Sequence, residues 1–437
     1  MPVLPVSGLP RIIFYEAMIS DKDRNKALNA VIATQCFGLV AWLCFGNGLI
    51  FNYLTYLDVP EQSLVLYLRL PSILALFTTL PLAYIADKKG KLKMGQFGNA
   101  VQILGMACLC SAAYISGNKS LAILGGILLF SLGSSMVNSS WFALLDPIVK
   151  PEKRGSFFAK LRTTWQLFGV VFTFGAQFIL EMEGDSIISP ILMFVVFLII
   201  IRMYFYSKIP ELEVKDPDRS GSGASFKEEF KVLLTYKPFI RFSIFILILP
   251  LFIGSITLIF NLYEQAYLKF SSADIVLMGN LVMIGSILGF AIGALLLKKL
   301  GDKLLFFICS CCISACAILF VLHEYFSFVP IKMFIGFVTL CTGLSMSAMS
   351  IGITSLMLHL LPKENKSFST SFFLSAQELG TGISAVILSL TISFFSDNNK
   401  KLASINLNVY TVTLLIIAVL FPLGVIIFNR SIKDEKS

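Results

Sequence analysis

Glu378 is the first residue whose type and setting could do chemistry, because it interrupts a long apolar run, "STSFFLSAQELGTGIS". In a helix over 369–394 it lies about ten residues, or roughly 15 Å, from the start. An ionisable group at that depth in a membrane marks a functional site by default. A desolvated carboxyl can hold a proton, so Glu378 is predicted to bind and release one. The alternative is a structural hydrogen bond or ion pair between helices.

Three more ionisable residues lie inside or at the edge of apolar runs. Arg162 could bind an anionic group, or its side chain could extend to the nearest membrane surface. Arg69, just before Pro71, is predicted to pair with a carboxylate or to line an outer vestibule. Glu264, in "FNLYEQAYLKF", is expected at the outer membrane interface or in a cavity.

Uncharged polar and tryptophan side chains at mid-run positions are the remaining candidates for a cavity that binds a solute. They are Gln35, Trp42, Asn47, Asn138, Trp141, Trp165, Gln166 and Gln377. Such residues can also simply hydrogen-bond neighbouring helices together.

The composition indicates what must position these residues. The 437-residue chain is 56% hydrophobic and 14% charged, and its mean hydropathy is +0.82. Soluble domains carry about 25% charge, and the apolar runs recur at about 20 residues, the length that spans a bilayer. The chain is therefore predicted to be an integral membrane protein, surrounded by lipid.

An enzyme is not favoured, because no nucleophile–base pair and no glycine-rich phosphate loop is present. The nine cysteines lie in apolar runs without zinc-site spacing. Neither a cofactor nor a metal is predicted.

The predicted fold class is all-α, with twelve membrane-spanning helices. They are 29–54, 64–86, 95–116, 121–146, 156–180 and 188–207, then 240–263, 274–297, 304–323, 330–358, 369–394 and 405–428. The chain divides into a tail (1–28), a six-helix half (29–207), a linker (208–237), a second half (238–428) and a tail (429–437). The linker contains "SGSG", a flexible composition, and "SFKEEFKVLL", predicted to be a short amphipathic helix.

The basic residues orient this arrangement. Of 35 Lys and Arg residues, five fall in segments expected outside: Lys119, Lys269, Lys332, Lys400 and Lys401. Arg69 and Arg162 lie within spans, and the others are assigned to cytoplasmic segments. This asymmetry follows the positive-inside rule, so both termini are predicted to be cytoplasmic at the plasma membrane. The net charge of +9 is interpreted as orientation rather than as a surface for nucleic acid.

The second half repeats landmarks of the first at a shift of 211 residues. The pairs are Gly90 with Gly301, Pro151 with Pro362, Gln166 with Gln377 and Gly169 with Gly380. Parallel repeats of this kind build transporters whose site lies between the halves.

The connector "AYIADKKGKLK" after the second run carries a motif. Asp87, Lys88, Gly90, Lys91 and Lys93 match a signature of Gly, three residues, Asp, a basic residue, any residue, Gly and basic residues, with Ala83 in place of the first glycine. With twelve spans, the chain resembles the major facilitator superfamily. The second-half copy, "ALLLKKLGDK", lacks the aspartate.

The resemblance implies a cytoplasmic gate. Gly90 permits a tight turn, Asp87 can face the N-terminus of the eleventh helix, and the lysines can pair with Asp146. The gate residues are Asp87, Lys88, Gly90, Lys91, Asp146 and Arg154. The alternative is that the lysines only orient the chain.

The expected function is secondary transport of a small solute by alternating access, with protons as coupling ion, in a monomer. Import is favoured over drug or metabolite export, because helix five lacks the Gly-Pro-rich pattern of drug–proton antiporters. A transporter-like sensor or lipid scramblase is the alternative from another class, since a fold does not fix a function.

Overall fold

A computed structural model describes residues 19–145, 147–150, 154–212, 235, 237–326, 328–360, 366–397 and 408–431. These residues form helices joined by short connectors, and they contain no strand. The longer helices of the first part are α2 (Asp21–Gly46), α3 (Leu49–Tyr56), α4 (Glu61–Lys89), α5 (Lys91–Ser111), α6 (Ser120–Leu145), α7 (Arg154–Glu183) and α8 (Ile188–Tyr206). Those of the second part are α10 (Lys237–Ile253), α11 (Ile256–Ala266), α12 (Ser272–Val321), α13 (Ile331–Leu360), α14 (Lys366–Asp397) and α16 (Val409–Ser431).

Within the described ranges, 11 helical segments are long and apolar enough to cross a membrane. One of them, α12, has 50 residues and contains non-helical backbone at Gly301 (φ 75°, ψ 171°). Gly90, which separates α4 from α5, also has a positive φ of 102°. The two glycines paired by the repeat therefore both form a turn that other residues rarely adopt.

Two predicted helices are broken in the middle. The segment 29–54 is divided into α2 and α3 at Asn47 and Gly48, where Gly48 has a φ of 89°. The segment 240–263 is divided into α10 and α11 at Gly254 and Ser255. Pro250, inside α10, removes a backbone hydrogen bond just before the second break.

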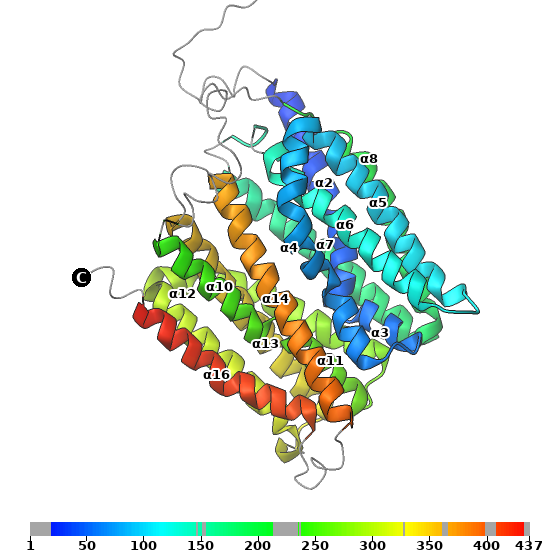
Figure 1. Ribbon diagram of the computed structural model, residues 1–437, viewed down its shortest axis with the longest axis vertical. Helices are drawn as coiled ribbons and strands as arrows, with labels where there is room; N and C mark the ends of the chain where they lie inside the picture. Colours follow the sequence, from blue (N-terminus) through cyan, green and yellow to red (C-terminus); the bar gives the residue numbers. More distant parts are fainter. Residues whose placement is uncertain are drawn as a thin grey trace, which may run out of the picture.

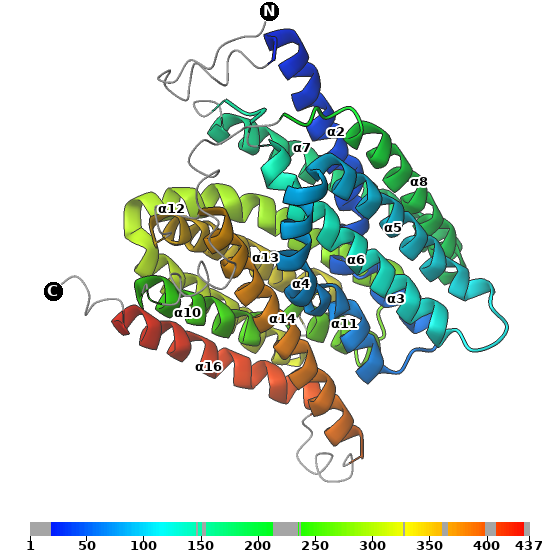
Figure 2. The ribbon, with the colours of Figure 1, turned by 45° about the horizontal axis from the view of Figure 1, so that its top comes forward.

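The helices lie in two neighbouring groups (Figure 1, Figure 2). Helices α2 to α8 lie on one side and α10 to α16 on the other. At the boundary between them α4 packs along α14, and α7 packs against α12. We name the two ends of the bundle after the ends of α4 and α5: the Glu61 end, where α4 begins, and the Lys91 end, where α5 begins.

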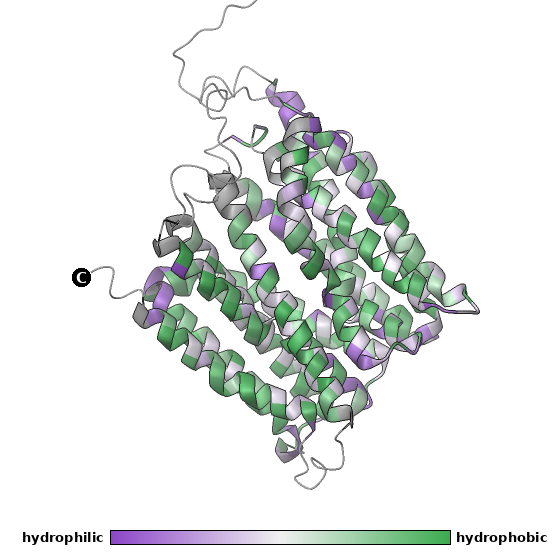
Figure 3. Cartoon of the chain, viewed as in Figure 1, coloured by the Kyte–Doolittle hydropathy of each residue, from purple (hydrophilic) through white to green (hydrophobic). Residues whose placement is uncertain are grey.

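Apolar residues cover most of the helical surface, and polar residues gather toward the helix ends (Figure 3). Large apolar side chains face outward from the bundle, among them Phe77, Leu295 and Ile427, each more than 60% exposed. Soluble monomers do not present so much apolar surface to water, so these side chains face lipid.

The glycine pair Gly169 and Gly380 occupies similar places in the two groups. A Cβ on Gly169 of α7 would lie 2.4 Å from the side chain of Leu43 in α2. A Cβ on Gly380 of α14 would lie 2.1 Å from the Leu247 carbonyl in α10. Gly380 needs glycine because the backbone of α10 packs directly on it, whereas at Gly169 the neighbour is the end of a flexible side chain. Pro151 and Pro362, another pair of the repeat, lie outside the described residues, as do most of the linker and both chain ends.

Candidate functional site

Glu378 and Arg69 lie on neighbouring helices at the boundary between the two groups. Arg69 lies on α4 and Glu378 on α14, and their charges interact. Ser72, one turn after Arg69, lies close enough to the Glu378 carboxyl to influence it as well. Both charged side chains are partly buried. Two ionisable residues that the sequence places inside spans of different halves are thus near enough for their charges to interact.

Hydrogen bonds join the two groups at the Glu61 end. The amide of Asn52 donates to the Ser272 carbonyl at 2.9 Å, and the Thr55 hydroxyl donates to the Gln265 amide oxygen at 3.4 Å. Two further bonds are donated by the Ser389 hydroxyl to the Gln62 carbonyl, at 2.9 Å, and by the Tyr410 hydroxyl to the Glu61 carboxylate. At the Glu61 end, α3 and the start of α4 are thus hydrogen-bonded to four helices of the second group: α11, α12, α14 and α16.

The breaks in the helices place polar groups inside the bundle. Asn47 is 2% exposed, and its side-chain oxygen accepts a hydrogen bond from the Leu49 backbone. Its amide nitrogen has no hydrogen-bond partner among the described residues. Asn280 of α12 is fully buried and likewise has no partner for either side-chain atom in that part of the chain.

Several predicted cavity residues present polar groups within the spans. Asn138 of α6, Arg162 of α7 and Gln377 of α14 are exposed. Gln166, one turn beyond Arg162, is 9% exposed, and Gln35 of α2 is partly buried.

The aromatic candidates pack within the first group of helices. Trp42 contacts Phe130 at a ring-centroid distance of 6.1 Å. Trp141 is buried and lies 6.1 Å from the ring of Tyr206 in α8. Trp165 packs against the same apolar cluster as Trp141. These contacts of Trp42, Trp141 and Trp165 all lie within the first group of helices.

Glu264 lies two residues before the end of α11. Its side chain is fully buried in α11. Neither carboxylate oxygen has a hydrogen-bond partner among the described residues, and the nearest charge that influences it is Asp274, of the same sign. A buried polar group without a partner is costly, so the structure holds this carboxyl at a free-energy cost.

The predicted gate is described only in part. Asp146 lies outside the described residues, as do the side chains of Asp87, Lys88 and Arg154. Gly90 forms the expected turn. The Lys91 backbone N–H donates to Glu211 at 2.6 Å, and Leu92 N–H donates to its other oxygen at 3.3 Å. Glu211 follows α8 and was not among the predicted residues. The residues around Glu211, which follows "KIP", do not indicate a contact with Lys91, because only the fold brings Glu211 to this connector.

Arg202 corrects the count of basic residues. It was assigned to a cytoplasmic segment, but it lies inside α8 and is 6% exposed. Its guanidinium donates to the Gln102 side chain at 2.7 Å, and Gln102 donates in turn to Ser134. The signal was present in the sequence, since "LIIIRMYFY" places an arginine within an apolar run.

Among the described residues no three His, Cys, Asp or Glu side chains are grouped to hold a metal ion. The arrangement is instead a bundle of lipid-facing helices with charged and amide groups along an internal boundary. This arrangement is that of a polytopic membrane protein.

Comparison with known proteins defines the class. The family model described as Major Facilitator Superfamily matches residues 17–173 and 56–385. The chain belongs to the Major Facilitator Superfamily, and it is a membrane transporter rather than an enzyme. No curated protein matches the chain in sequence.

Solved structures share the fold at low sequence identity. The POT family transporter PepTSo has a TM-score of 0.70 and 14% identity, over 94% of this chain and 98% of that one. The nucleoside transporter NupG gives a TM-score of 0.64 and 13% identity, over 93% of this chain and 98% of that one. A bacterial homologue of the iron transporter ferroportin, in an inward-facing state, has a TM-score of 0.66 and 14% identity, over 94% of this chain and 99% of that one.

Proposed function

We propose that this chain is a secondary transporter that imports a small polar solute by alternating access, with protons as the coupling ion. Its two moving parts are the groups α2–α8 and α10–α16. They hold six membrane spans each when α2–α3 and α10–α11 are each counted as one span and α12 is divided at Gly301. The interaction between Arg69 and Glu378 carries this proposal, because it links a proton-binding group to the boundary along which the groups must move.

The charges explain how a proton could be coupled to movement. An ionised Glu378 attracts Arg69 across the boundary, and the attraction is strong where water is excluded. A proton on Glu378 removes that attraction and leaves Arg69 without its counter-charge. The relative free energies of the two positions of α4 and α14 therefore depend on the proton, which is the requirement for coupling.

The broken helices support a central site. Interrupted helices at corresponding places in two repeats expose backbone groups near the middle of a membrane, where such transporters bind their solutes. Here the breaks at Gly48 and Gly254 lie in α2–α3 and α10–α11. The unpartnered amide of Asn47 stands at the first of them.

The orientation is part of the proposal. The lysine-rich connector between α4 and α5 is assigned to the cytoplasm by the positive-inside rule. The hydrogen bonds at the Glu61 end then close the outer side. We infer that the exposed groups of Asn138, Arg162 and Gln377 are reached from the cytoplasm, as in an inward-facing state of the proposed cycle.

The solute class follows from the polar groups and is tested with pools. Arg162 is a cation without an ion-pair partner among the described residues, so we propose that it binds an anionic group of the solute. Structural neighbours include a nucleoside transporter and POT family transporters bound to a peptide conjugate and to 5-aminolevulinic acid. Nucleosides, short peptides and amino acids such as 5-aminolevulinic acid are therefore the first pools to try.

Proton flux tests the proposal. The purified chain is reconstituted in liposomes that contain a pH-sensitive dye, and each pool is added outside. We expect a pool-dependent change of internal pH that empty liposomes lack. Glu378→Gln should abolish proton-driven accumulation while it preserves solute exchange, and Glu183→Gln, an exposed carboxylate at the far end of α7, should behave as the parent. Accumulation that survives Glu378→Gln contradicts the proton role.

A further inference from the structure

The break between α2 and α3 lies directly against the backbone of α12. A Cβ on Gly279 would lie 2.4 Å from the Asn47 carbonyl oxygen and 2.7 Å from the Asn47 Cα. Both atoms are backbone, so no rotamer change could relieve the overlap. This contact joins the two helix groups without a side chain on either partner.

Gly48, the next residue, also packs closely against the second group of helices. A Cβ on Gly48 would lie 2.9 Å from the Ile275 side chain and 3.5 Å from the Asn261 amide. Gly48 also has the positive φ that favours glycine. The break thus fits between α11 and α12, and it turns α3 along them toward the Glu61 end.

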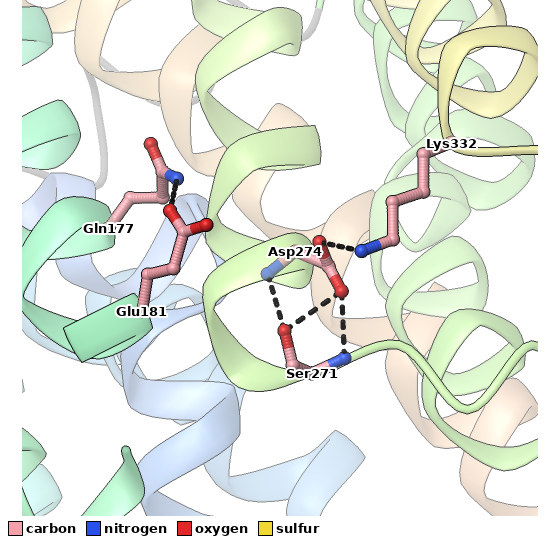
Figure 4. Close-up of polar contacts among 5 residues, drawn as sticks. All are labelled: Gln177, Glu181, Ser271, Asp274 and Lys332. Atoms are coloured by element: carbon pink, nitrogen blue, oxygen red, sulfur yellow. Dashed lines mark hydrogen bonds and ion pairs between the residues drawn. The ribbon is translucent and has the colours of Figure 1, made fainter. Parts of the chain in front are cut away.

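The face that receives α3 is itself fixed. Ser271 and Asp274 form a capping box at the start of α12, and Asp274 makes an ion pair with Lys332 of α13 at 2.7 Å (Figure 4). The same figure shows Gln177 and Glu181 of α7, which bond each other at 3.3 Å near this helix start. Because α12 is held to α13 within its own group, opening of the Glu61 end must separate α3 from α12 as the two groups move apart.

We propose that the contact between Gly279 and Asn47 is the seat on which the Glu61 end closes, and that side-chain size at position 279 sets the equilibrium between its closed and open states. This inference rests on the proposed alternating-access function, in which this end opens once per cycle. A methyl group at 279 meets Asn47 only when the end is closed. It therefore raises the free energy of one state and not of the other, which is the condition for shifting a population.

Cross-linking measures the closed population without a transported solute. Thr55 and Gln265 bond each other in the closed state, and both are replaced by cysteine in the full chain. A short bifunctional thiol reagent is added, and the linked peptides are quantified by mass spectrometry. We expect rapid linking in this parent pair, and linking slowed about tenfold when Gly279→Ala is added, the effect of a modest overpacking. Equal rates overturn the proposal.

The matched control is Gly175→Ala, because a Cβ at Gly175 meets nothing within 4 Å. It should leave the linking rate of the pair unchanged. The reactivity of a single Thr55→Cys with a water-soluble maleimide gives the opposite readout, since the open state exposes this position. Gly279→Ala should raise that reactivity, and Gly175→Ala should not.

Gel filtration shows whether the Gly279→Ala protein is folded. The parent cysteine pair gives a test that does not require that variant to fold. Failure of the parent pair to link shows that the Glu61 end is not closed in solution, and it overturns the proposed seat. Absence of proton flux with every solute pool contradicts the proposed proton-coupled transport. The linking rates then still decide whether Gly279 and Asn47 form the closing contact.

Discussion

Glu211 caps the helix that Lys91 begins. Its carboxylate accepts hydrogen bonds from the backbone N–H groups of Lys91 and Leu92, at 2.6 and 3.3 Å. These are two of the four N–H groups that a helix start leaves without an intrahelical partner, and the negative charge also favours the positive end of the helix dipole. The segment after α8 is thereby fixed to the signature connector between α4 and α5.

Loss of this cap should destabilise the chain. Glu211→Ala is expected to lower the free energy of unfolding by about 0.5–2 kcal/mol, the usual cost of a lost N-cap. The measurement is the midpoint of thermal unfolding in detergent. Glu183→Ala, at an exposed position, is the control. Equal midpoints for Glu211→Ala and the parent would show that the bond contributes nothing.

Gly38 should not tolerate a methyl group. A Cβ there would lie 2.2 Å from Nε and 2.5 Å from Cζ of Arg202, and this guanidinium is buried and bonded to Gln102. Gly38→Ala should cost about 1–3 kcal/mol by overpacking. The change is measured as a lower unfolding midpoint.

The rescue of this variant identifies the cause. Gly38→Ala combined with Arg202→Val should recover much of the loss, because the Cδ, Nε and Cζ atoms that meet the new methyl group are gone and a buried charge is removed. Gly46→Ala on the same helix, where a Cβ meets nothing within 4 Å, should be neutral. A double variant as unstable as Gly38→Ala alone rejects the collision with Arg202.

Arg69 and Glu378 should be energetically coupled. Arg69→Gln leaves a partly buried carboxylate without its counter-charge, so it should destabilise more than the double variant with Glu378→Gln. The difference from additivity should be about 0.5–3 kcal/mol, the range for groups in contact. The unfolding midpoints of the parent, the two single variants and the double variant give this value. Strict additivity would show that Arg69 and Glu378 are not coupled.

Arg162 should act on the solute and not on the fold. Its side chain is exposed, so Arg162→Ala should change stability by less than about 0.5 kcal/mol. Binding of an anionic solute should weaken by about tenfold or more, as for a lost bond to a charged group, and binding of a neutral analogue should not change. Lys160→Ala, an exposed cation on the same helix, is the control. Equal losses for both solutes indicate a structural role.

The buried carboxyl of Glu264 is expected to lower the stability of the folded chain. Glu264→Met removes a buried carboxyl without a hydrogen-bond partner among the described residues and keeps a similar volume, so the unfolding midpoint should rise. Transport should fall if this group takes part in the cycle, the usual cost at a functional position. A lower midpoint would show that a partner satisfies the carboxyl.

The sequence predicted the helices and the family because hydropathy is a local property. Each predicted span overlaps a helix, and the glycine at position 90 forms the turn that the motif requires. Glu378 and Arg69 could be selected because ionisable residues in apolar runs are rare. Their pairing could not be predicted, since they are separated by more than 300 residues and no local pattern records the contact.

The sequence by itself determined that this chain spans a membrane with long apolar helices, because only such helices satisfy their backbone groups in lipid. The tertiary structure decided where those helices break, which carboxyl is buried and which caps a helix. Gly48, Glu264 and Glu211 have ordinary neighbours in the sequence, and their roles arise from elements that are distant along the chain. Packing between such elements sets burial and partners, and it therefore sets the energy of each polar group.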